Sequence, residues 1–125
     1  MNELIGKKIT GLSRITDQVL IFDTPSESVA YQTDSECCSE TWFDALEGVD
    51  NLIGHTVCSV EALSFGQIDD GDNIIQPYGY KVTTDAGSFL LIFRNKSNGY
   101  YGGSVILTHD FDKTKAIAIC DDWSR

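Results

Sequence analysis

The sequence predicts an α+β domain, a mostly antiparallel β-sheet of about six to eight strands with one short helix packed on it. Three observations lead to this class. Short apolar stretches with alternating polarity recur along the chain, turn-forming residues separate them, and one segment has helical spacing instead. A chain of 125 residues with 42% hydrophobic residues can build one core and is too short for two ordinary ones. We therefore expect a single domain spanning residues 1–125.

The first third of the chain predicts an antiparallel meander. A short mixed segment at 8–14 is followed by an apolar run within 18–23. After a break at Pro25, Val29 and Tyr31 alternate with polar neighbours. Alternation of this kind is typical of strands that bury one face.

The segment after Ser39 predicts the helix. Ser39 is a favourable N-cap, and Gly48 is a typical stop signal. Trp42 and Leu46 lie four residues apart, with Phe43 beside them, which is the spacing of an apolar helix face. We expect a short amphipathic helix whose apolar face packs on the sheet.

The rest of the chain predicts further strands. The segment 66–73 is polar and is expected to be a loop, while 85–87 is expected to be the turn of a hairpin. The strands expected here span residues 56–63, 78–84, 88–95, 104–108 and 115–120.

The net charge is −10, and acidic residues dominate one long stretch. No lysine or arginine occurs between Arg14 and Lys81, although this stretch contains thirteen aspartates and glutamates. Direct binding to nucleic acid is disfavoured, because its affinity comes largely from cationic side chains. A basic protein partner suits this charge better.

Membrane insertion and export are not predicted. The longest apolar runs, such as 89–93, are far shorter than the roughly 20 residues that cross a bilayer, and the N-terminal residues contain no apolar signal region. We expect a cytoplasmic protein.

The predicted helix would concentrate carboxylates on its solvent side. Glu40, Asp44 and Glu47 would share that side, with Glu36 and Asp50 near the two ends. The functional interpretation is that this face steers the protein onto a basic groove and competes there with nucleic acid. The alternative is that the carboxylates only keep a small protein soluble.

Two motifs carry a resemblance to a known family. They are CCSETWF at 37–43, continuing to GVDNLIG at 48–54, and FRNKSNGYYGG at 93–103. With the opening residues 5–9, they resemble a family of small uncharacterised proteins found mostly in bacteriophages and prophages. The likeness covers most of residues 5–108 and not 110–125. It implies a phage origin and no particular reaction.

The second motif also contains a candidate ligand loop. Its glycines permit a close backbone approach, tyrosines stack on planar groups, and arginine can bind phosphate or carboxylate. The candidate residues for a nucleotide-like ligand are Arg94, Asn95, Asn98, Tyr100 and Tyr101. The alternative is a structural turn in which the tyrosines cover the sheet.

The cysteines do not form a recognisable metal or catalytic motif. Zinc could in principle use Cys37, Cys38, Cys58, Cys120, His55 and His109, but adjacent cysteines lack the usual ligand spacing. We expect reduced, buried thiols, because adjacent cysteines would close a strained ring. Cys38 precedes the predicted helix, but the neighbouring Glu36 and Glu40 would raise its pKa rather than activate it.

The acidic cluster at 69–73 resembles only part of a calcium loop. The spacing is wrong for an EF-hand and no closing glutamate follows, so a solvated hairpin loop is expected. We predict no metal, no cofactor and no catalytic residue, which favours a binding protein over an enzyme. The function predicted is a phage-derived acidic inhibitor of a host defence protein, of the anti-CRISPR or anti-restriction kind. The alternative is a small-ligand binding protein or enzyme that uses the loop from Arg94 to Gly103.

Overall fold

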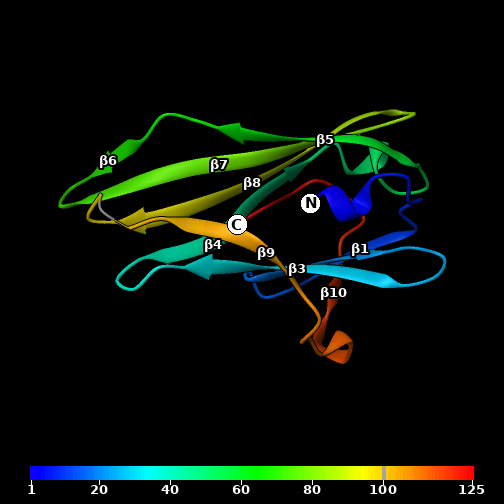
Figure 1. The fold of residues 1–125 in the computed structure, drawn as a ribbon, viewed down its shortest axis with the longest axis horizontal. Helices are drawn as coiled ribbons and strands as arrows, with labels where there is room; N and C mark the ends of the chain where they lie inside the picture. Colours follow the sequence, from blue (N-terminus) through cyan, green and yellow to red (C-terminus); the bar gives the residue numbers. More distant parts are fainter. Residues whose placement is uncertain (100) are drawn as a thin grey trace.

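The chain folds as two antiparallel β-sheets stacked face to face (Figure 1). A computed structural model describes residues 1–99 and 101–125. One sheet has five strands in the order β10-β1-β2-β3-β9. Its strands are β1 (Gly11–Ile15), β2 (Val19–Asp23), β3 (Ser28–Ser35), β9 (Gly103–Thr108) and β10 (Ile117–Ala118).

The other sheet has six strands. Their order is β11-β4-β8-β7-β5, and β6 pairs with β7 beyond this path. Its strands are β4 (Glu40–Glu47), β5 (Val57–Ser64), β6 (Ile68–Asp70), β7 (Asn73–Thr84), β8 (Gly87–Ser97) and β11 (Trp123–Ser124). The prediction of a mostly antiparallel β protein is confirmed, and the strands divide between two layers.

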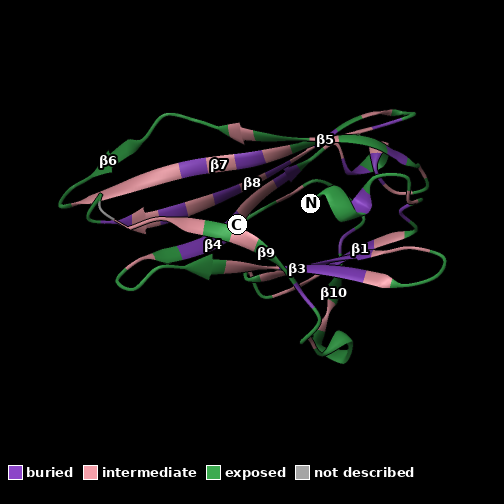
Figure 2. Cartoon of the chain, viewed as in Figure 1, coloured by how far each residue is buried: buried purple, intermediate pink, exposed green. Residues whose placement is uncertain are grey.

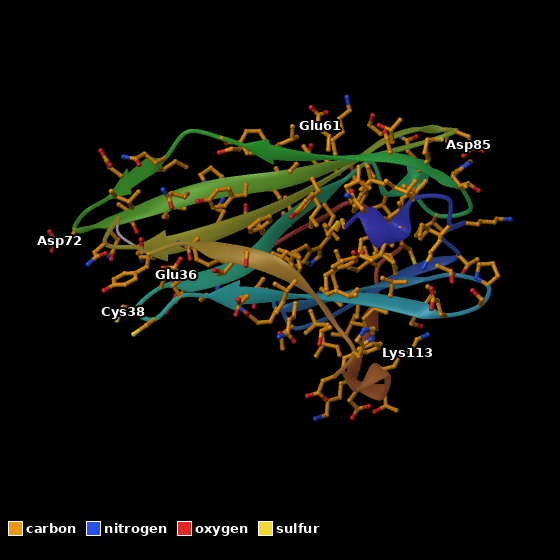
Figure 3. All side chains as sticks on the ribbon, in the orientation of Figure 1. Glu36, Cys38, Glu61, Asp72, Asp85 and Lys113 are labelled. Carbon is orange, nitrogen blue, oxygen red and sulfur yellow. The ribbon has the colours of Figure 1, made fainter. Side chains whose placement is uncertain are left out.

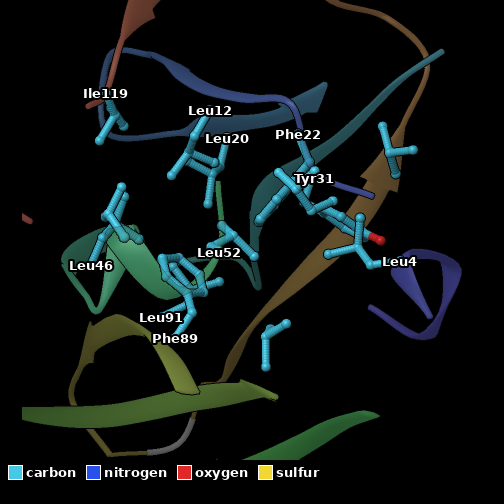
Figure 4. Packing of buried hydrophobic residues seen from close by; sticks show 14 of the residues in the cluster. Leu4, Leu12, Leu20, Phe22, Tyr31, Leu46, Leu52, Phe89, Leu91 and Ile119 are labelled. Atoms are coloured by element: carbon cyan, nitrogen blue, oxygen red, sulfur yellow. The ribbon is translucent and has the colours of Figure 1, made fainter. Parts of the chain in front are cut away.

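The core lies between the two sheets, and strand alternation produces it (Figures 2 and 4). Along β8, Phe89, Leu91 and Phe93 are buried, whereas the residues between them are more exposed. They share one hydrophobic cluster with Leu20 and Phe22 of the opposite sheet, where the rings of Phe89 and Phe22 meet edge to face. Burying each such side chain stabilises the fold by about 1.5–3 kcal/mol.

The predicted helix is wrong, because residues 40–47 form strand β4. β4 pairs with β8 and contains a bulge at Asp44, so that Phe43 lies opposite Phe93 and Leu46 opposite Leu91. A bulge places an extra residue between two inward side chains. The inward spacing therefore becomes three instead of two, which imitates helical periodicity.

The helical segments within residues 1–99 and 101–125 are short 3-10 turns. They are η1 (Asn2–Leu4), η2 (Val49–Asn51) and η3 (Lys113–Lys115). None of the described helices has the length and apolarity that crossing a bilayer would require.

The other predicted elements are largely confirmed. The meander corresponds to β1, β2 and β3, and the hairpin to β7 and β8. The predicted loop at 66–73 contains β6, which pairs with the start of β7. The strand predicted at 115–120 shrinks to the two residues of β10.

The C-terminal segment joins the two sheets along one side. β10 pairs with β1 of the five-stranded sheet, and β11 pairs with β4 of the other. The guanidinium of Arg14 lies 5.2 Å from the ring centre of Trp123, and that of Arg125 lies 4.7 Å from Trp42. These aromatic contacts fix the segment against both layers.

Candidate functional site

The two family-like motifs meet at one end of the sandwich. The turn between β3 and β4 carries Glu36 and Cys38, which lie together in Figure 3. The backbone N–H of Glu36 donates to the carbonyl of Gly102, with 3.1 Å between nitrogen and oxygen. Ser39 Oγ lies 3.2 Å from the same carbonyl oxygen. The turn at 36–39 is therefore joined to the connection between β8 and β9.

A buried polar network holds this junction. Ser35 Oγ donates to Thr41 Oγ1 at 2.8 Å, and Thr41 Oγ1 donates to Asn95 Oδ1 at 2.9 Å. Asn95 Nδ2 in turn donates to the Tyr101 carbonyl at 2.9 Å. Asn95 is completely buried, so these bonds satisfy groups that would otherwise be costly to remove from water.

The candidate ligand residues that the structure describes do not converge on one cavity wall. Asn95 points into the network between the sheets, and the neighbouring Arg94 points to the opposite face of β8. Arg94 Nε lies 3.0 Å from Asp44 Oδ2 in an ion pair. Asn98 is exposed and Tyr101 is half-buried, whereas Tyr100 lies outside the described residues. This arrangement gives the nucleotide-like alternative no support.

An open cavity lies beside the turn. Its volume is about 370 Å³, and it is lined by Cys38, Ser39, Glu40, Asn73, Lys96 and Ser97. Asn73 begins β7 directly after the β6–β7 turn, so that turn and the β3–β4 turn flank one hollow. Lys96 Nζ, on its wall, forms an ion pair with Asp70 Oδ2 at 3.2 Å.

Exposed carboxylates gather around this end, which we call the acidic end. It comprises Asp34, Glu36, Glu40, Asp69, Asp70 and Asp72. Glu36 and Asp72 occupy the same end of the molecule in Figure 3. Lys96 compensates part of this charge through Asp70. Asp34 and the β6–β7 aspartates were not expected at the candidate site, because these two turns come together only when both sheets have formed.

The predicted acidic helix face is wrong in its geometry. Glu36 and Glu40 belong to the acidic end, whereas Glu47 closes β4 at its other end and Asp50 lies in η2. At ~3.3 Å per residue, Glu40 and Glu47 are about 20 Å apart along the strand. Asp44, between them, forms an ion pair with Arg94. The five carboxylates therefore form two separated groups and one internal ion pair.

The cysteines are free and exposed, which corrects the expectation of buried thiols. Cys37 Sγ and Cys38 Sγ lie 3.1 Å apart, so their hydrogen bond and a little burial raise the pKa of the Cys38 thiol. A raised pKa opposes a role as an activated nucleophile. No group of three potential metal ligands occurs among the described residues, and His55 Nδ1 instead lies 3.3 Å from Asp85 Oδ1.

Comparisons with known proteins identify a family whose function is unknown. No curated protein and no solved structure matches the chain. A family model described as a domain of unknown function, DUF7448, matches residues 2–107, which include both motifs, strands β1 to β8 and all but the last residue of β9. The match extends over most of the 125 residues, and the chain therefore belongs to the DUF7448 family.

Proposed function

We propose that this protein is a phage-derived inhibitor that binds a basic surface of a host defence protein through its acidic end. The observation that carries the proposal is the meeting of six exposed carboxylates, from the β3–β4 turn region and the β6–β7 turn, at one end of the sandwich. Their charges add at short range, and a partner groove lined with lysine and arginine would complement them.

The hydrogen bonding of the β3–β4 turn supports this proposal. The β3–β4 turn is tied to Gly102 by two hydrogen bonds, and Asn95 anchors the adjoining connection from within the core. A surface that is already ordered loses less conformational entropy on binding than a mobile loop does. Because the backbone of the turn is held, Glu36 and Glu40 extend from defined positions and can take the place of the phosphates that the groove normally binds.

The proposal places the protein in the host bacterial cytosol, where CRISPR complexes and restriction enzymes act on DNA. It follows from the resemblance of the two motifs to phage and prophage proteins and from the net charge of −10. A protein with this net charge would not bind DNA itself. It would therefore act by occupying the DNA-binding groove of the enzyme.

A competition experiment tests the proposal. Purified CRISPR surveillance complexes and restriction endonucleases are titrated with fluorescent DNA in the presence and absence of the chain, and DNA binding is followed by anisotropy. We expect the apparent Kd for DNA to rise with the concentration of the chain for at least one enzyme. Unchanged DNA binding across the set would contradict the proposal.

Paired charge reversals test whether the acidic end carries the binding. The variant Glu36→Lys/Glu40→Lys reverses two charges at the acidic end, and Glu47→Lys/Asp50→Lys is the matched control at the other end of β4. We expect the first variant to slow association by about tenfold or more at low salt and the control to change it little. The difference should shrink as salt rises, because the Debye length falls from about 10 Å at 0.1 M to about 3 Å at 1 M. Equal effects of the two variants would show that overall charge, and not the acidic end, governs binding.

A further inference from the structure

The turn between β3 and β4 contains two adjacent thiols that point toward one another. Their sulfur atoms are 3.1 Å apart, and both residues are exposed. Cys38 has a φ of 71°, a left-handed backbone conformation that is unusual for a residue other than glycine. In an extended strand, adjacent side chains point to opposite faces. The turn therefore creates a contact that a strand would prevent.

We propose that Cys37 and Cys38 form a reversible disulfide with each other, and that this bond changes the shape of the acidic end. The proposal goes beyond the binding function, because it assigns a modification site and depends only on the geometry of the turn.

The oxidant is a low-molecular-weight disulfide. One cysteine thiolate attacks it, forms a mixed disulfide and releases one molecule of free thiol. The second cysteine thiolate then attacks the protein sulfur of that mixed disulfide and releases the other thiol. The pair loses two electrons and two protons, and the small disulfide is reduced to two thiols.

Ring strain makes this disulfide easy to reduce, so it would be a reversible modification and not a stabilising cross-link. Disulfide formation between neighbours closes an eight-membered ring through the peptide, which strains the bond. Strained and exposed disulfides are the ones that thiols reduce readily. The bond should therefore form under oxidising conditions and open again when reduced thiol is restored.

The turn transmits the change to the acidic end. Its hydrogen bonds include Ser39 N–H to the Glu36 carbonyl at 3.1 Å, and both residues also bond the carbonyl of Gly102. Drawing the two sulfur atoms into covalent contact requires the backbone at Cys38 to move. The neighbouring carboxylates of Glu36 and Glu40 move with this backbone. The hydrogen bonds of the turn to the Gly102 carbonyl change as a result.

The test uses the Cys58→Ser/Cys120→Ser variant, in which only the adjacent pair remains. Its probe is bis(2-hydroxyethyl) disulfide, which is neutral and is not repelled by the surrounding carboxylates. After oxidation, mass spectrometry with N-ethylmaleimide labelling should show the loss of two hydrogen atoms, no bound hydroxyethylthio group and no labelled thiol. Dithiothreitol should restore two labelled thiols. The control Cys38→Ser/Cys58→Ser/Cys120→Ser should stop at a mixed disulfide on Cys37.

Three results would overturn the proposal. They are two hydroxyethylthio groups on the paired variant, disulfide-linked dimers on non-reducing gels, and two thiols that stay free while the control reacts. A second measurement addresses the change of shape in the wild-type chain. Amide resonances of Glu36, Ser39 and Gly102 should shift on oxidation and return on reduction, and resonances unchanged after the ring has formed would refute the conformational part.

Discussion

At the scale of single residues, Gly103 explains how the two motifs can approach so closely. It begins β9 opposite Ser35 and directly beside the buried network. A Cβ at this position would fall on Thr41 Oγ1 and within 2.7 Å of Asn95 Oδ1. Glycine is therefore required here by the close approach of polar side chains from β4 and β8, and the end of the motif at 93–103 has a structural reason.

The substitution Gly103→Ala should destabilise the fold. The added methyl group must displace Thr41 or Asn95 and break their hydrogen bond, which should lower the free energy of unfolding by about 1–3 kcal/mol. The matched control is Gly66→Ala, where an added Cβ meets no atom within 4 Å. That change should be neutral or stabilise by up to about 1 kcal/mol. Urea unfolding followed by fluorescence compares the two, and equal midpoints would contradict the role given to Gly103.

Individual residues also show what could be anticipated at the candidate site. The sequence indicated Asn95 as a candidate residue but did not show that its side chain would be buried. Neighbouring residues of a strand face opposite sides, and which side faces the core is known only when the strand has been placed in its sheet. The contact between Cys37 and Cys38 could not be predicted from the sequence either. It depends on the left-handed backbone of Cys38, and no glycine or proline in the turn indicated one.

At the scale of elements, β4 shows where periodicity misleads. Strands that pair without a register shift, such as β2 and β3, were predictable because a short apolar run or an alternating segment bounded by turn residues is typical of a strand. In β4 the extra residue at Asp44 separates Phe43 from Leu46 by three positions. A favourable N-cap at Ser39 and a glycine at Gly48 then completed the appearance of a helix. A single sequence cannot distinguish a bulged strand from a short amphipathic helix on spacing alone.

Deletion of Asp44 tests the bulge directly. Without it, one residue separates Phe43 from Leu46, and regular pairing with Phe93 and Leu91 follows. We expect the variant to fold with an unchanged far-ultraviolet circular dichroism spectrum. Its free energy of unfolding should be lower by about 1–2 kcal/mol, because two interactions of Asp44 disappear. These are the ion pair with Arg94 and the hydrogen bond from the Arg125 N–H to the Asp44 carbonyl.

The control for this prediction deletes Ile92 in β8, which has no bulge there. Removing one residue from a regular central strand turns every following side chain to the other face, so this variant should not fold. An Asp44 deletion that is as damaging as the Ile92 deletion would contradict the bulge.

At the scale of the whole molecule, the sandwich depends on where the chain changes sheets. The sequence predicted most of the strands, the N-terminal meander and the β7–β8 hairpin, but it placed them in a single sheet. Nothing local shows that β3 and β4, joined by a tight turn, belong to different sheets. Pairing over long separations, such as β3 with β9, decides the layers. The acidic end follows from this arrangement, because the β3–β4 and β6–β7 turns meet only after both sheets form.

The C-terminal segment has a structural role for the whole sandwich, although the family match ends at residue 107. Its strands cover the edges of β1 in one sheet and β4 in the other. Ile119 is 5% exposed within the core, and Trp123 packs against it. Uncovered strand edges offer unpaired N–H and carbonyl groups to other chains. The segment should therefore both stabilise the fold and keep copies of it apart.

Removal of residues 110–125 tests this role. The shortened chain loses Ile119 and Trp123 from the core, and deletion of large buried side chains costs about 2–5 kcal/mol each where the site is fully buried. We expect a clearly lower urea midpoint and association that increases with concentration in sedimentation velocity, because the edges of β1 and β4 are free to pair. Adding the peptide 110–125 should reverse both effects, since it can pair again with both edges. A shortened chain that stays monomeric at the original midpoint would show instead that the two sheets hold together without the strands that join their edges.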